Sequence, residues 1–143
     1  MITKQLTVFR VIHNILIKGF IIVLLYRCIM KKIEAVIPST RLGTAFEALD
    51  ALSIGGLTYY DSKGRGQVPR PRLHSGRGTS TYIPEFNVNS LIMLVVKDSL
   101  VSKIIDTMLE RLSTGLAGEG KIFVSDIDDA VDIGSRTRGE SAI

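Results

Sequence analysis

The sequence is poor in the residues on which many catalytic and metal sites depend. Cys28 is the only cysteine, so the chain cannot form an internal disulfide or a cysteine-based metal site, which fits a reducing cytoplasm. The chain has 2 histidines, His13 and His74, and no Ser-His-Asp or Cys-His arrangement can be assembled from them. We therefore expect a cytoplasmic protein that is not an enzyme.

Acidic residues are absent from residues 1–29, which contain Lys4, Arg10, Lys18 and Arg27. The whole chain has 18 basic and 14 acidic residues. Without those four basic residues, residues 30–143 hold 14 of each and are formally neutral. The basic excess therefore does not predict nucleic-acid binding.

Residues 1–29 also lack a long hydrophobic run. The run Gly19–Tyr26 has 8 residues, whereas a membrane-spanning helix needs about 20. The segment ends without the small residues of a signal cleavage site. It is an upstream extension from an over-early start codon, an interfacial anchor, or a helix packed on a domain of residues 30–143, and we favour the first.

The acidic residues near the C-terminus do not form a recognisable cation site. Asp126, Asp128, Asp129 and Asp132 lack the glycine and the terminal glutamate of an EF-hand loop. We interpret them as a solvated acidic edge and predict no metal site.

Hydrophobic periodicity predicts a single α+β domain. Residues 32–37, 57–61, 89–96 and 122–124 favour strands, and two amphipathic segments favour helices. The first helix is expected to be capped by Ser39 or Thr40, and the second, which ends at Leu112, by Asp98 or Ser99. The order β-α-β-loop-β-α-β is typical of a ferredoxin-like sandwich, with an antiparallel sheet and both helices on one face.

A long loop, residues 63–81, interrupts the periodic pattern. It is rich in glycine, proline and arginine. Loops longer than about 12–15 residues without secondary structure are uncommon in compact domains and are usually functional or disordered. Its basic character predicts an acidic or phosphorylated partner, and the alternative is a solvated, disordered loop.

The glycine turn, Gly115–Lys121, is the strongest chemical signal in the sequence. Glycines let backbone N–H groups approach an anion closely, and Lys121 adds a positive charge. The spacing partly matches a P-loop, but Ile122 stands where a Mg²⁺-binding Ser or Thr is required, and the turn follows a helix instead of opening one. We therefore predict a phosphate-holding turn of another kind, or a turn that only reverses the chain.

Five segments together resemble the PII signal-transduction family across residues 30–143. They are 30–37, 56–58, 63–66, 118–125 and 138–143. The resemblance implies a homotrimer that binds ATP or ADP in clefts between subunits and often senses 2-oxoglutarate. It also implies that the long loop, the family's T-loop, docks on an ammonium transporter or a nitrogen-assimilation enzyme.

The resemblance also implies roles for individual residues. The expected nucleotide-binding residues are Val36, Thr58, Gly64, Gly66, Gly118, Glu119, Gly120, Lys121, Arg136 and Arg138. The expected partner-binding residues of the loop are Arg65, Gln67, Arg70, Arg72 and Arg77. Tyr82 lies near the place of the family's uridylylated tyrosine and is a candidate for modification; otherwise it begins the third strand.

Several positions depart from the family pattern. Asp132 and Gly134 stand where two phosphate-binding arginines are usual, which leaves Arg136 or Arg138 to replace them. Asn89 replaces a lysine that would pair with 2-oxoglutarate. We expect nucleotide binding that is weakened toward ADP, AMP or another ligand, and these replacements argue against 2-oxoglutarate and Mg²⁺ sensing. The alternatives are a structural trimer without sensing and, if the extension is an anchor, a membrane-tethered adaptor.

Overall fold

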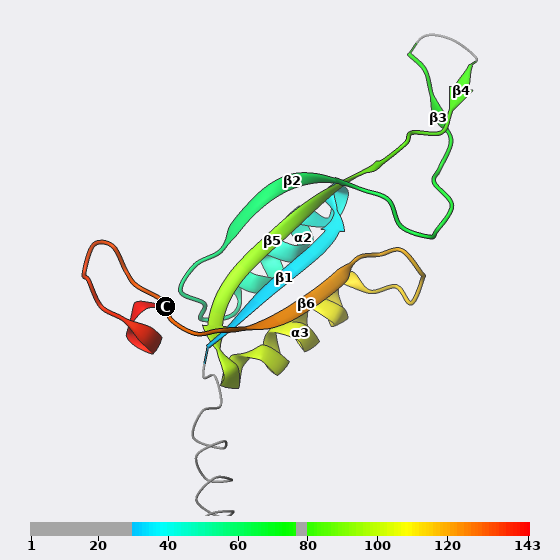
Figure 1. The fold of residues 1–143 in the computed structure, drawn as a ribbon. Helices are drawn as coiled ribbons and strands as arrows, with labels where there is room; N and C mark the ends of the chain where they lie inside the picture. The colour runs from blue at the N-terminus through cyan, green and yellow to red at the C-terminus, as the bar shows by residue number, and fades with distance from the viewer. Residues whose placement is uncertain (1–29, 77–79) are drawn as a thin grey trace, which may run out of the picture.

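The computed structural model describes residues 30–76 and 80–143. Four antiparallel strands form the main sheet in the order β2-β5-β1-β6, and α2 and α3 cover one of its faces (Figure 1). The strands are β1 (Met30–Pro38), β2 (Thr58–Gly64), β5 (Asn87–Lys97) and β6 (Lys121–Ile127), and the helices are η1 (Ser39–Arg41), α2 (Leu42–Asp50), α3 (Asp98–Leu112) and η2 (Gly139–Ala142). The α+β fold is the predicted ferredoxin-like sandwich.

Side-chain alternation in the central strands builds the core. In β1, Ile33, Ala35 and Ile37 are buried, and the residues between them are half-buried. The same alternation runs along β5, because registered partners such as Ile33 and Leu94 point to one face. Buried residues of α2 and α3, including Leu49 and Met108, pack onto that face. The other face, which we call the open face, carries none of the helices of residues 30–76 and 80–143 (Figure 1).

The long loop contains more structure than the sequence predicts. β2 continues to Gly64 because Ser62 and Lys63 pair with β5. A short hairpin of β3 (Leu73–His74) and β4 (Thr81–Tyr82) follows. Tyr82 therefore belongs to this hairpin and does not begin the third main strand, which starts at Asn87. Arg77 and the N-terminal extension lie outside the described residues.

The predicted helix caps are wrong. The turn η1 leads directly into α2, and neither helix has a side-chain hydrogen bond at its N-cap. Asp98, expected as a possible cap, is instead the first residue of α3. Its negative charge in the first turn still favours the helix through the macrodipole.

The two ends of the sheet carry different parts of the chain. The long loop and the glycine turn lie at one end, and the C-terminal segment lies at the other (Figure 1). Lys97 Nζ lies 3.0 Å from Glu140 Oε1, which ties the C-terminal segment to the start of α3. A Cβ built on Gly55 would lie 3.1 Å from the Ile143 carbonyl carbon, so the end of the chain lies close to Gly55.

Among the described residues, no helix is long and apolar enough to cross a membrane.

Candidate ligand-binding site

The glycine turn connects the end of α3 to the start of β6, as the sequence predicts. Its last glycine, Gly120, has φ 134°, a conformation that L-residues other than glycine rarely adopt. A Cβ built there would lie 2.4 Å from the Val36 carbonyl oxygen. The turn is therefore pressed against β1, and only glycine fits at this point of contact.

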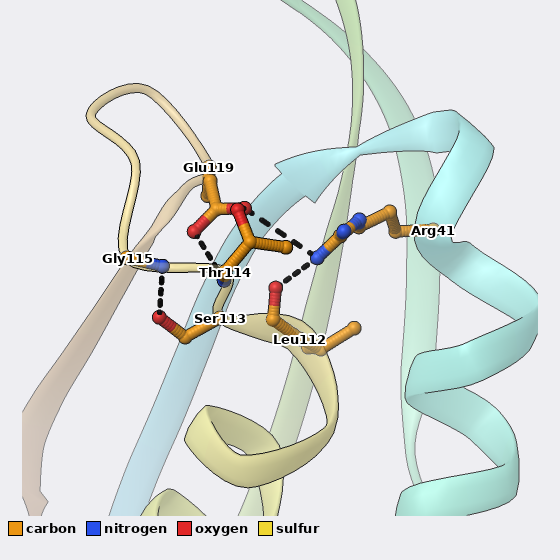
Figure 2. Close-up of polar contacts among 6 residues, drawn as sticks. All are labelled: Arg41, Leu112, Ser113, Thr114, Gly115 and Glu119. Carbon is orange, nitrogen blue, oxygen red and sulfur yellow. Dashed lines mark hydrogen bonds and ion pairs between the residues drawn. The ribbon is translucent and has the colours of Figure 1, made fainter.

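A cluster of polar contacts stabilises the turn (Figure 2). Thr114 donates to Glu119 from its backbone N, at 2.8 Å, and from its Oγ1, at 2.6 Å. Arg41 Nη1 lies 3.7 Å from Glu119 Oε1 and also donates to the Leu112 carbonyl at the end of α3. The two hydrogen bonds from Thr114, and then the charge of Arg41, lower the pKa of Glu119. The Glu119 carboxylate is thus engaged in holding the turn closed.

Val36 and Lys121 are neighbours at the outer edge of the turn. They are registered partners of β1 and β6, so their side chains lie on the same face of the sheet. This is the open face, because the next residue, Ile37, is buried under the helices. The structure therefore brings together Val36, Lys121 and the glycines of the turn, with the lysine exposed.

A separate hollow of about 480 Å³ lies beside the turn. Its lining includes Ile37, Met108, Leu112 and Ile122, together with backbone of the turn. The side chain of Ile37 belongs to the helix-covered face. The hollow is therefore mainly apolar and lies on the opposite side of the sheet from the open face.

The root of the long loop folds onto the glycine turn. A Cβ built on Gly118, whose φ is 92°, would lie 3.0 Å from Val68 Cγ2. At the root itself, a Cβ on Gly64 would lie 2.6 Å from Asn89 Nδ2. Gly66 is exposed and lies two residues before Val68. The root of the loop therefore contacts the turn through Val68, which the sequence did not single out.

The polar residues expected to meet a partner differ in their surroundings. Arg65, Gln67 and Arg72 are exposed. Arg70 is half-buried, and its Nη1 donates to the carbonyls of Pro84, at 2.9 Å, and Glu85. In the hairpin, Tyr82 has 51% of its surface exposed. Arg70 therefore braces the base of the loop.

Thr58, Arg136 and Arg138 do not lie near the turn of their own chain. Thr58 is on edge strand β2 and the turn leads into the opposite edge strand, β6, so three strand spacings, roughly 14 Å, separate them. Both arginines follow the far end of β6, whose 7 residues span about 20 Å. The separation of Thr58 from the turn depends on the strand order, and that of the two arginines depends on the length of β6.

The C-terminal segment is organised by its own polar contacts. Arg138 forms an ion pair with Asp129, which lowers the pKa of that carboxyl group. Hydrogen bonds from the Ser135 backbone and side chain lower the pKa of Asp132. Arg136 has φ 61° and its backbone N donates to the Asp132 carbonyl at 2.9 Å. Asp129 and Asp132 thus stabilise the loop conformation of the C-terminal segment.

Asp126 is also paired, since it accepts a hydrogen bond from Lys31. In the parts of the chain that the structure describes, no three His, Cys, Asp or Glu side chains form a group suited to a metal ion.

Three residues that contact the turn, Arg41, Thr114 and Val68, could not be predicted from the sequence. Arg41 and Val68 contact residues distant in the chain, and Thr114 contacts Glu119 through the conformation of the loop. No local sequence pattern marks any of the three.

Comparison with known proteins places these features in a family. Residues 30–138 match the family model for nitrogen regulatory protein P-II. The nitrogen regulatory protein P-II of Rhodospirillum rubrum is 37% identical over 115 residues, covering 80% of this chain and 100% of the relative. A solved structure of the B. subtilis GlnK–ATP complex matches with a TM-score of 0.62 and 27% identity, covering 80% of this chain and 98% of that one. Arabidopsis thaliana PII bound to citrate matches with a TM-score of 0.64 and 29% identity, covering 80% and 92%.

Proposed function

Because the chain belongs to the nitrogen regulatory protein P-II family, a family of regulators and not of enzymes, we propose that it senses an adenine nucleotide at the glycine turn. The nucleotide phosphates would lie near the backbone of Gly118 and Gly120, with Lys121 as the positive charge. Val36 would contact the base from the open face. The occupied site would then change the conformation of the long loop, which signals to a partner of nitrogen metabolism.

The contact between the loop root and the glycine turn carries this proposal. A turn that only reversed the chain would not need the long loop packed on it, yet Val68 lies against Gly118. A ligand at the turn would therefore act directly on the loop. The solved complex of the related GlnK with ATP supports an adenine nucleotide as the ligand.

We further propose that the protein works as a homotrimer. One chain holds the turn beside edge strand β6, Thr58 on the opposite edge strand β2, and Arg136 and Arg138 beyond the far end of β6. A complete site would therefore need a neighbouring chain. Tyr60 and Phe123 are about half exposed on the open face, at 49% and 53%, and a neighbouring subunit would bury them.

The remaining assignments rest on the family resemblance. Exposed Arg65, Gln67 and Arg72 would contact an ammonium transporter or a nitrogen-assimilation enzyme, and exposed Tyr82 would be open to modification. We place the protein in the cytoplasm, with residues 30–143 as the working domain. Asn89 packs against Gly64 and carries no charge, which argues against a 2-oxoglutarate site there.

Calorimetric titration of the full chain with ATP, ADP and AMP, with and without Mg²⁺, tests the nucleotide site. The Lys121→Ala variant should bind roughly 10- to 100-fold more weakly, because a charge-assisted hydrogen bond contributes about 1.5–3 kcal/mol. Lys103→Ala, which removes an exposed lysine of α3, is the matched control and should bind normally. If the wild-type protein binds none of the three nucleotides, the proposal fails.

One observation favours a second function, that of a structural or adaptor trimer with lost sensing. Asp129 already pairs with Arg138, so that arginine must break an ion pair before it can reach a phosphate. This function predicts a trimer whose thermal stability does not change with any of the nucleotides, because a ligand stabilises a protein only when it binds the folded state.

A further inference from the structure

Val68 is an apolar residue in an otherwise polar and basic part of the long loop, and it lies directly over the glycine turn. The Cβ position of Gly118 is 3.0, 3.3 and 3.5 Å from Val68 Cγ2, Cβ and Cγ1. All three side-chain carbons of the valine therefore face this one glycine. Val68 itself retains 41% of its surface exposed, so the contact covers the turn from the solvent side.

The loop segment that carries Val68 is held at a second point nearby. Two residues later, Arg70 donates to the carbonyls of Pro84 and Glu85 on the returning arm of the loop. The β3–β4 hairpin follows immediately. Movement of Val68 would therefore move the base of the hairpin.

We propose that Val68 couples the glycine turn to the loop by competing with the ligand for the space over Gly118, an inference that rests on the proposed nucleotide site. Valine methyl groups offer no hydrogen bond, so a phosphate placed against them would lose hydration without compensation. An anion bound close to Gly118 thus requires Val68 to leave. The docked loop lowers the apparent affinity, and the bound ligand releases the loop.

This competition predicts that a smaller side chain at position 68 improves binding. Val68→Ala removes two methyl groups from a partly buried contact and should favour the released loop, tightening ADP binding about two- to fivefold. If Val68 only supported the shape of the site, the same substitution would weaken binding. The direction of the change therefore separates the two roles.

The test compares the wild-type chain with Val68→Ala and with a matched control, Val88→Ala. Val88 is 62% exposed and lies on β5 opposite Lys63, away from the glycine turn. Each protein is titrated with ADP by calorimetry. Limited trypsin cleavage after Arg72 reports loop release, since the bond after Arg70 precedes Pro71 and resists trypsin.

We expect tighter ADP binding and faster cleavage after Arg72 in Val68→Ala alone. ADP should accelerate this cleavage in the wild-type protein and have little further effect in Val68→Ala. Unchanged or weaker ADP binding by Val68→Ala, or the same gain in Val88→Ala, would overturn the inference. If the wild-type protein does not bind ADP, the nucleotide proposal fails for that ligand. The cleavage rates without ligand then decide whether Val68 holds the loop, and equal rates in the three proteins would refute it.

Discussion

Replacing Gly120 with alanine should destabilise the protein more than any other glycine substitution in the turn. The φ of 134° at Gly120 costs about 1–3 kcal/mol for a residue with a side chain. The new Cβ would also lie 2.4 Å from the Val36 carbonyl oxygen. Because β1 is paired on both sides, by β5 and β6, it cannot easily move away. Forced repacking of this kind typically costs another 1–3 kcal/mol or so.

Gly115 provides the matched control for this calculation. Its φ of 84° is also positive, but a Cβ there would meet nothing within 4 Å. Gly115→Ala should therefore cost only about 1–2 kcal/mol, from the backbone conformation alone. Gly43, in the first turn of α2, also has open space around its Cβ position. Gly43→Ala should stabilise the protein by up to about 1 kcal/mol.

Urea unfolding of the variants, followed by circular dichroism at one fixed protein concentration, measures these differences, since the stability of an oligomer depends on concentration. The expected order of stability is Gly43→Ala, wild type, Gly115→Ala and Gly120→Ala. If Gly120→Ala and Gly115→Ala unfold at the same urea concentration, the contact with β1 contributes nothing and the reasoning is refuted.

The core, the glycine turn and the base of the long loop each contain a contact whose loss can be measured. Met108→Ala should lower the free energy of unfolding by about 2–5 kcal/mol, because Met108 is fully buried, whereas Leu109→Ala at a half-exposed position should cost much less; equal losses in urea unfolding would contradict this. Glu119→Gln should reduce stability at neutral pH, because the lowered pKa means that folding favours the ionised carboxylate. That difference should shrink as the pH falls through the lowered pKa, and a difference independent of pH would contradict the assignment. Arg70→Ala should speed chymotrypsin cleavage after Tyr82 severalfold, because it removes two hydrogen bonds at the base of the loop; an unchanged rate would show that the brace is unimportant.

The order of strands and helices could be predicted from the sequence, because it depends on local patterns. Alternation along β1 and β5 and helical spacing along α2 and α3 each repeat within a few residues. The glycine turn is equally local, and its position between a helix and a strand already separates it from a P-loop. The hairpin in the long loop was missed because its two strands contain only two residues each and show no periodicity.

Local patterns were therefore enough to predict the fold class, the glycine turn and the grouping of site residues that are neighbours in the chain. The contacts between distant residues could not be read from these patterns. Arg41 reaches the end of α3 across 71 residues of sequence, and Val68 reaches Gly118 through the path of a long loop. Strand order separates Thr58 from the turn, and the length of β6 separates the two C-terminal arginines from it. Such contacts depend on sheet register and loop path, which are set by the packing of the whole domain and leave no signal in a short stretch of sequence.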